Sequence, residues 1–401
     1  MRGSAIAKIG TMSLNFKFAI VSDPHITLPH TLWDSPHRFH LGEVSIPALE
    51  KILAHLSNLD LDFLLLPGDL TQHGEPDNHR WLAQRLSQLP YPAYVIPGNH
   101  DIPVETANGT SIGMADFPTY YPASGYDNPR QLYYTHPLLP GVRLIGLNSN
   151  QFDAQGDQIG WVDDAQLRWL EQVLQEFRHE RLLVMIHHNV LEHLPGQANS
   201  AIGRRYMLGN APALLNLLRA AGVQLIFTGH LHIQDIAYSQ GIYDITTGSL
   251  VSYPHPYRVL HFQTDRQGNQ WLQIESSRVE AVPGWEQLQT TSREHLGARS
   301  QPFMLQLLTQ PPLNLPLTAA TPLVPDLRYF WAEIAKGDPL FQFPHFPDPV
   351  RRYFESFSAI SRDGTPTLID NATSLLLTPT PISEKIRTTP QQVIGRLNDK
   401  I

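Results

Sequence analysis

The sequence has no cysteine among its 401 residues. Disulfide-stapled folds, thiol nucleophiles and thiolate metal sites are therefore excluded. A chain without cysteine also suits a reducing compartment, and we expect a cytoplasmic protein.

Charged residues are scarce as well, at 16% of the chain, and their balance is acidic. Lysine and arginine number 29 against 37 aspartate and glutamate residues, which gives a formal net charge of −8. Such a chain has no global basic field to hold a nucleic-acid backbone or an anionic membrane surface. We therefore expect neither a nucleic acid nor a membrane as a partner, and a phosphate-bearing substrate would have to be held locally.

Long apolar runs are also missing. The longest runs, residues 63–66 and 182–186, have the length of a β-strand and not of a membrane-spanning helix. Hydrophobic residues nevertheless make up 42% of the chain, enough to build a substantial core.

From residue 16 to about residue 277, short β-like runs alternate with amphipathic helical segments. Apolar runs at residues 16–23, 61–69, 93–96, 142–148, 181–188 and 223–230 read as strands, and residues 46–56, 81–89, 163–177 and 213–221 read as helices. Three further β-like runs follow at residues 242–247, 258–263 and 271–275. The alternation predicts an α/β core, with some antiparallel strands late in the chain.

Beyond residue 282 the composition changes. Ten prolines lie between Gln301 and Val350, and we expect no long regular element there. Aromatic residues are frequent in the same stretch, which argues against a disordered tail. We therefore expect an N-terminal extension (1–15), an α/β domain (16–282) and a C-terminal accessory segment (283–401) that packs on the core.

Five of the predicted strands end in aspartate, asparagine or histidine. In open α/β sheets the carboxyl ends of the strands form the edge where ligands bind. The residues are Asp23 and His25 in SDPH, Asp69 in GD, Asn99, His100 and Asp101 in GNHD, His187 and His188 in IHH, and His230 and His232 in GHLH. These residue types also occur in turns, and each motif alone is weak. Five segments that converge with one ligand chemistry are hard to attribute to chance.

Carboxylate oxygens and imidazole nitrogens together suit divalent manganese, iron or zinc. Two such ions about 3.5–4 Å apart can clamp the attacking and leaving oxygens of a phosphoryl displacement. A shared site of this kind needs a bridging carboxylate, for which Asp69 is the candidate. In GNHD a histidine stands beside a ligand and before a carboxylate, as expected if His100 is an acid near the phosphate and Asp101 fixes its tautomer.

The five motifs, in this order, resemble those of the calcineurin-like metallophosphoesterase superfamily. They extend from Ser22 to His232, more than half of the chain. The resemblance implies a four-layer α/β/β/α sandwich with a dinuclear metal centre at the carboxyl ends of the strands. One ion would be held by Asp23, His25, Asp69 and His232, and the other by Asp69, Asn99, His187 and His230. The resemblance also implies that His100 contacts the phosphate or protonates the leaving group, that Asp101 holds His100, and that a metal-bound hydroxide is the nucleophile.

The IHH and GHLH segments look most like the bacterial branch that contains cyclic-nucleotide phosphodiesterases and purple-acid-phosphatase-like hydrolases. Asn189 follows the double histidine where that branch commonly has proline, a departure that concerns the substrate and not the metals. We expect a hydrolase of phosphomonoesters or phosphodiesters that acts on a small phosphate ester with two divalent ions of Mn, Fe or Zn.

Two alternatives to this function remain. One is a cyclic-nucleotide phosphodiesterase, and the other, from a different class, is a non-catalytic scaffold that uses the fold to bind proteins. A scaffold tends to lose metal ligands, above all the GNHD histidine, whereas this chain keeps all of them. A nuclease is less favoured, because no stretch rich in lysine or arginine lies near the motifs.

Overall fold

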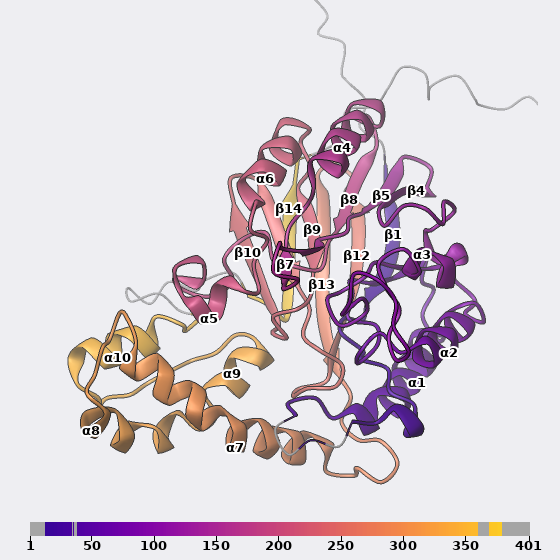
Figure 1. Ribbon diagram of the computed structural model, residues 1–401. Helices are drawn as coiled ribbons and strands as arrows, with labels where there is room; N and C mark the ends of the chain where they lie inside the picture. Colours follow the sequence, from indigo (N-terminus) through magenta and orange to yellow (C-terminus); the bar gives the residue numbers. More distant parts are fainter. Residues whose placement is uncertain (1–12, 34, 36–37, 360–368, 379–401) are drawn as a thin grey trace, which may run out of the picture.

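Short apolar runs form two six-stranded sheets in the computed structural model, which describes residues 13–33, 35, 38–359 and 369–378 (Figure 1). The first sheet has the strand order β14-β13-β12-β1-β2-β3 and the second β10-β11-β9-β8-β5-β4. Strands of the first sheet are β1 (Asn15–Ile20), β2 (Phe63–Leu66), β3 (Ala93–Val95), β12 (Pro256–Thr264), β13 (Gln270–Arg278) and β14 (Ala372–Leu377). Those of the second are β4 (Tyr134–Leu139), β5 (Val142–Gly146), β8 (Arg181–Met185), β9 (Leu225–Thr228), β10 (Asp235–Ser239) and β11 (Ile242–Thr246). A separate two-stranded sheet consists of β6 (Asn150–Phe152) and β7 (Gln158–Gly160).

Both sheets combine parallel and antiparallel strands: the parallel strands form one half of the first sheet and the centre of the second. β1, β2 and β3 run parallel to one another, as do β5, β8, β9 and β11. β12, β13 and β14 add antiparallel pairs to the first sheet, and β4 and β10 add them to the second. The predicted α/β core with late antiparallel strands is confirmed, and the parallel strands deliver their carboxyl ends to one edge.

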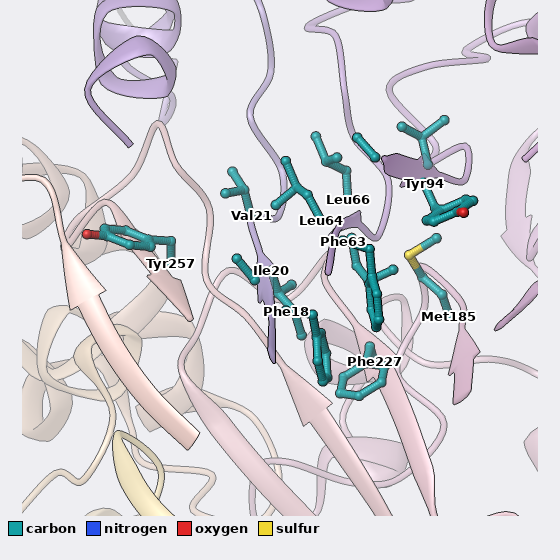
Figure 2. Close-up of a cluster of buried hydrophobic side chains, with 14 of the residues drawn as sticks. Phe18, Ile20, Val21, Phe63, Leu64, Leu66, Tyr94, Met185, Phe227 and Tyr257 are labelled. Atoms are coloured by element: carbon teal, nitrogen blue, oxygen red, sulfur yellow. The ribbon is translucent and has the colours of Figure 1, made fainter. Parts of the chain in front are cut away.

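Successive side chains of a strand point to opposite faces of its sheet, so they pack in two different hydrophobic layers. Phe18 of β1 and Phe227 of β9 meet edge to face between the sheets, with ring centroids 5.5 Å apart, and Met185 of β8 belongs to the same cluster (Figure 2). The neighbouring Val184 points to the other side of the second sheet and packs in a cluster with helices α4 (Asp164–Glu176) and α6 (Ala211–Ala220). The second sheet is therefore buried on both faces.

Helices also cover the outer face of the first sheet, where α1 (Ser45–Leu56) and α2 (Pro76–Leu86) lie. The hydroxyl of Tyr257 on β12 is 2.7 Å from Nδ1 of His55 on α1, and Tyr257 alternates with the inward-facing Leu260 and Phe262. The layer order is therefore α/β/β/α. The shorter helical elements are η1 (Pro29–Thr31), η2 (Gly42–Val44), α3 (Phe117–Tyr120), η3 (Pro122–Ser124), η4 (Gln197–Asn199) and α5 (Ala201–Arg204).

The C-terminal third forms a group of helices beside the sandwich (Figure 1). Its elements are α7 (Leu288–Thr309), α8 (Leu317–Ala320), η5 (Thr321–Leu323), η6 (Pro325–Leu327), α9 (Phe330–Lys336) and α10 (Asp348–Glu355), after which β14 joins the first sheet. The expectation of no long regular element between residues 301 and 350 was wrong at the start of that stretch, because the 22-residue helix α7 runs through Pro302 to Thr309. Burial of Leu296 before the proline and of Met304 and Leu308 after it stabilises the continuous helix. Beyond α7 the elements are short, as expected.

The aromatic residues of this third pack mainly against one another. Phe330 contacts Phe341 and Phe354, with ring centroids 4.5 and 5.0 Å away. The cluster that they form meets the sandwich through Leu231 and Ile233 and not through the sheet faces. The aromatic residues expected on the α/β core thus form a small core of their own.

Parts of the predicted segments fall outside the described residues: residues 1–12 of the N-terminal extension, and residues 360–368 and 379–401 of the C-terminal segment. Among the described residues, no helix has the length and apolar character needed to cross a membrane.

Candidate metal centre

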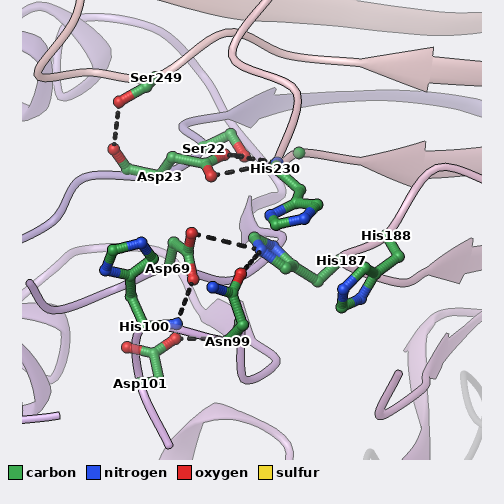
Figure 3. Close-up of polar contacts among 12 residues, drawn as sticks. Ser22, Asp23, Asp69, Asn99, His100, Asp101, His187, His188, His230 and Ser249 are labelled. Atoms are coloured by element: carbon green, nitrogen blue, oxygen red, sulfur yellow. Dashed lines mark hydrogen bonds and ion pairs between the residues drawn. The ribbon is translucent and has the colours of Figure 1, made fainter. Parts of the chain in front are cut away.

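All seven predicted ligand residues meet at the edge where β1, β2, β3, β8 and β9 end. Figure 3 shows five of them: Asp23, Asp69, Asn99, His187 and His230. Nitrogen or oxygen atoms of Asp23, His25, Asp69 and His232 lie within 4.8 Å of one another, and the same holds for Asp69, His187 and His230. Asn99 belongs to the second group, because its Oδ1 is 3.2 Å from Nε2 of His187. The structure therefore brings together both sets of groups that the motifs predict, and they share Asp69.

The Asp69 side chain has the environment of a bridging carboxylate. Its Oδ1 accepts a hydrogen bond from the backbone N–H of His100 at 2.8 Å. Its Oδ2 is buried without a well-aligned donor among the described residues, 3.7 Å from Nε2 of His25 and 3.3 Å from Nε2 of His187. Burial alone would raise the pKa of Asp69, but His187 and His100 hold it well below its usual range. An ionised oxygen between two histidine groups fits a pair of cations.

Backbone carbonyls orient two of the histidines. Nδ1 of His187 donates to the carbonyl of Pro67 at 2.8 Å, which leaves Nε2 directed at Asp69 and Asn99. Nε2 of His230 lies 3.3 Å from the carbonyl of Arg205, which leaves Nδ1 for a ligand. A hydrogen bond at one ring nitrogen fixes the tautomer and offers the other lone pair to a metal. The donor set therefore fits divalent cations.

The imidazoles of His25 and His230 are kept neutral. Burial, followed by the neighbouring His40 and His100, holds the pKa of His25 well below its usual value. Burial and the nearby His188 act in the same way on the pKa of His230. Only the neutral imidazole has a lone pair for a metal, so this environment favours the coordinating form.

The backbone of the centre is strained. Five of the seven predicted ligands have positive φ angles: Asp23 (48°), His25 (40°), Asp69 (49°), His230 (66°) and His232 (59°). Non-glycine residues in this region cost about 1–3 kcal/mol each and persist where the surroundings enforce them, typically at functional sites. Gly98 lies so close to Asp69 that a Cβ would come within 2.2 Å of its backbone nitrogen and Oδ1. Only glycine fits there.

His100 lies beside the two groups and faces the cavity above them. Its Nδ1 donates to the backbone carbonyl of Gln72 at 2.7 Å, and its ring lines the cavity. The expectation that Asp101 fixes the His100 tautomer was wrong, because a backbone carbonyl has that position. His100 and Asp101 are consecutive residues of a turn, and their side chains leave it in different directions.

Asp101 instead holds together the two loops that carry Asp69 and Asn99. The buried carboxylate accepts hydrogen bonds from the backbone N–H groups of Leu70, Thr71 and Gly98 at 3.0, 2.8 and 2.8 Å. Burial and the charge of Asp69 raise the pKa of Asp101 to about 7, although these three N–H groups act in the opposite direction. Its position is that of a structural support and not of a partner to His100.

Asn189 ties the end of β8 to the GHLH loop. Its amide nitrogen donates to the Thr228 hydroxyl at 3.1 Å and to the Gly229 carbonyl at 3.3 Å. A proline could not make these contacts. The asparagine therefore acts behind the histidines and does not face the cavity.

His40 is a member of the centre that the motifs did not predict. Its ring centroid is 4.0 Å from that of His25 and 5.0 Å from that of His232, and Nδ1 is 3.2 Å from Oε1 of Gln72. It also forms a possible ligand group with these two histidines. His40 arrives from a loop and not from a strand end, so no motif marked it.

A cavity of about 500 Å³ opens above the centre. Asp69, Asn99, His100, His230 and His232 form its polar side. Other residues that the sequence did not assign to the site line the remainder: Phe39, His40, Gln158, Arg205, Tyr206, Leu231, Ser252, Leu296, Ser300, Phe303, Trp331 and Ala335. His188 and Tyr253 line it too, and His188 Nδ1 is held by the Ser149 hydroxyl at 2.7 Å.

Residues 16–234 match the family described as calcineurin-like phosphoesterase, and this span is more than half of the chain. The chain belongs to this family. It is therefore a metal-dependent phosphoesterase, a hydrolase of phosphoric ester bonds, and it uses divalent cations.

Several relatives have names that refer to phosphodiesters. A probable glycerophosphodiester phosphodiesterase of Arcobacter nitrofigilis is 29% identical over 220 residues, covering 53% of this chain and 70% of the relative. A 3′,5′-cyclic-nucleotide phosphodiesterase of Nostoc sp. is 27% identical over 53% of this chain and 71% of its own. A probable cyclic nucleotide phosphodiesterase of Synechococcus sp. is 31% identical, and the matched region covers 53% of this chain and 73% of the relative. Among solved structures, a dimetal phosphatase from Danio rerio is 16% identical with a TM-score of 0.46, covering 65% of this chain and 95% of that one.

Proposed function

We propose that the chain is a phosphodiesterase with two divalent ions, one held by Asp23, His25, Asp69 and His232 and the other by Asp69, Asn99, His187 and His230. The observation that carries this proposal is the Asp69 carboxylate, whose buried Oδ2 lies between histidines of both groups. The mixed oxygen and nitrogen donors suit Mn, Fe or Zn.

The ions, when bound, would lower the pKa of a water molecule and neutralise charge on the phosphate. The chain's own residues position the reaction. Asp69 would be a ligand of both ions, and the carbonyls of Pro67 and Arg205 orient His187 and His230. His100, with Nδ1 donating to Gln72, offers Nε2 to a phosphate oxygen or to the leaving group.

The charge of the cavity favours a diester over a monoester. Among the described residues that line it, Arg205 is the single lysine or arginine side chain. A diester has one negative charge near neutral pH, whereas a monoester has up to two and would call for more positive groups. The names of the relatives from Arcobacter, Nostoc and Synechococcus also support a diester.

A cyclic nucleotide is a second candidate, favoured by the names of the Nostoc and Synechococcus relatives. We also propose a small substrate, a cytoplasmic location because cysteine is absent, and no nucleic-acid or membrane partner because the net charge is −8. Residues 16–282 would be the phosphoesterase domain and residues 283–401 its accessory segment.

Turnover tests the proposal directly. Metal-free protein is reconstituted with Mn²⁺, Fe²⁺ or Zn²⁺ and assayed with bis(p-nitrophenyl) phosphate, p-nitrophenyl phosphate and 3′,5′-cyclic AMP. We expect kcat/KM to be highest for a diester. A preference for the monoester would overturn the diester assignment. Absence of turnover with every metal and substrate would favour the non-catalytic scaffold.

A further inference from the structure

The cavity has two chemically different sides. One side has the imidazoles, and the other is apolar and comes from the C-terminal helices: Leu296 and Phe303 from α7, and Trp331 and Ala335 from α9. These four residues are called the helical wall below. The family match ends at residue 234, so the wall is an addition of this chain to the matched region.

The helical wall has a fixed structure. Trp331 and Phe303 pack edge to face, with ring centroids 5.4 Å apart. α7 is joined to α9 by an ion pair of 2.9 Å between Arg293 and Glu333. Ser300 also donates to the carbonyl of Arg328 at 2.8 Å. The wall is therefore formed before a substrate arrives.

The helical wall is also tied to the candidate metal ligands. Leu231 and Ile233 alternate with His230 and His232 in the GHLH loop and pack in the hydrophobic cluster of the C-terminal helices. Loop residues that alternate in this way direct the histidines to the phosphate position and the aliphatic side chains to the helices. The distance from that position to the wall is therefore set by one short segment.

The charges around the cavity indicate what the helical wall accepts. Asp69 is the single acidic residue among the described lining residues, and it lies within the metal centre. No carboxylate is present on the wall to attract an ammonium group, and the charge of Arg205, which also lines the cavity, would oppose the attraction of the Trp331 ring for a cation. Polar groups close to the wall are few, with Ser300 already bonded to a carbonyl. A hydroxyl-rich group such as glycerol would lose hydrogen bonds to water there without replacing them.

We propose that the helical wall is the subsite for the second ester group of the substrate, and that this group is apolar, uncharged and of the size of one or two rings. The inference rests on the proposed phosphodiesterase function and specifies its substrate class. An aromatic or branched apolar group would displace water from Phe303 and Trp331 while its phosphate reaches the imidazoles. Selection among substrates by their second ester group then comes from residues 283–359 and not from the region that matches the family, residues 16–234.

Diesters with one common leaving group test the proposal. Each has p-nitrophenol as the leaving group and either hydroxyethyl, choline, n-butyl or 2-naphthyl as the second ester group. The second group also changes the reactivity of phosphorus, so each kcat/KM is divided by the rate constant for uncatalysed release of p-nitrophenol from the same ester. Every comparison of kcat/KM in the series uses this ratio, which reports the contribution of the protein. We expect kcat/KM for the naphthyl ester to exceed that for the hydroxyethyl ester at least about tenfold, with the choline ester lowest.

Variants locate the preference in the helical wall. Trp331→Ala should lower kcat/KM for the naphthyl ester about tenfold and change that for the hydroxyethyl ester less than about twofold. Phe303→Ala serves as a second variant if Trp331→Ala does not fold. Phe341→Ala is the matched control, because Phe341 packs in the same helical cluster and does not line the cavity.

Binding gives a readout without turnover. Isothermal titration calorimetry compares 2-naphthylmethylphosphonate with hydroxymethylphosphonate, which are not hydrolysed. Tighter binding of the naphthyl compound, lost in Trp331→Ala and kept in Phe341→Ala, supports the proposal. Turnover with equal kcat/KM across the series, or with the choline ester preferred, would overturn the subsite and leave the phosphodiesterase intact. No turnover of any diester would remove the proposed function, and the inference with it.

Discussion

Asp69 is the one residue shared by both groups of candidate ligands. Its substitution therefore distinguishes a bridged dinuclear centre from two independent metal sites. Asp69→Asn keeps the size of the side chain and removes its charge. We expect the purified variant to lose most of its bound metal in elemental analysis, while Asp60→Asn, at an exposed position, keeps it. Two ions per chain with full activity in Asp69→Asn would show that this carboxylate is no bridge.

His100 faces the cavity without belonging to either group of ligands. We therefore expect His100→Ala to keep its metal and to lose turnover by about 10²–10⁴-fold, the usual worth of one positioned acid or base. The loss should be greatest for esters with poor leaving groups, which depend most on a proton donor. A metal content that falls together with activity, and a loss independent of the leaving group, would make His100 a ligand.

The sequence predicted the residues that cluster at the metal centre but not the contacts that hold them in place. Asp23, His25, Asp69 and the others stand at strand ends, where residue type and position both indicate a ligand edge. Gln72 holds His100 through a backbone carbonyl, which no residue type reveals. His40 reaches the centre only because the chain folds its loop over His25. Contacts of these two kinds depend on tertiary structure and not on a local pattern.

At the scale of elements, the strands were predictable and the long helix α7 was not. Buried parallel strands have continuous apolar runs, and either of two adjacent aspartates, Asp163 or Asp164, could have capped α4. The structure places the cap at Asp163, whose side chain accepts from the N–H of Gln166 at 2.8 Å. The prolines of the C-terminal third argued against a helix of 22 residues. Burial on both sides of Pro302 outweighs the hydrogen bond that it removes, and burial is a property of the packed molecule.

A buried histidine joins the loop after β8 to β10 and β11. Nδ1 of His193 is 2.7 Å from Oδ2 of Asp235, and Nε2 is 3.3 Å from Oδ2 of Asp244. Asp244 also accepts from the N–H groups of Val190 and Leu191 at 2.8 and 3.0 Å. The protonated imidazole thus secures the segment that directly follows His187 and His188.

This cluster predicts a pH dependence of stability. Burial lowers the pKa of His193, but Asp244 and Asp235 outweigh it and raise the pKa to about 10, above the value of 6.5 for a solvated histidine. The stabilisation is therefore fully present below pH 6.5 and is lost as the pH rises through about 10. We expect the urea midpoint of metal-free protein to fall more steeply between pH 7 and pH 10 than that of His193→Gln. Parallel curves for the two proteins would assign no such role to His193.

At the scale of the whole molecule, the C-terminal third completes the first sheet. β14 pairs with β13 along residues 270–275, and the fully buried Arg258 donates to the backbone carbonyl of Asp370. The sequence could not predict the pairing of β14 with β13, because the two strands lie about a hundred residues apart and their pairing depends on the fold. The same segment supplies the helical wall, so it contributes to the stability of the first sheet and, by our proposal, to substrate selection.

Removal of residues 283–401 tests whether the α/β domain stands alone. The deletion would leave Arg258 without the carbonyl of Asp370, expose the edge of β13 and uncover Leu231 and Ile233. A buried N–H group without its acceptor and newly exposed apolar groups each cost about 1–3 kcal/mol, and an open strand edge promotes association. We expect an insoluble product, or a soluble one destabilised by at least about 3 kcal/mol in urea unfolding. A chain that ends at Thr378 keeps β14 and serves as the control. If the core of residues 1–282 proved soluble, equally stable and equally active on the naphthyl and hydroxyethyl diesters, the C-terminal third would be a dispensable appendage.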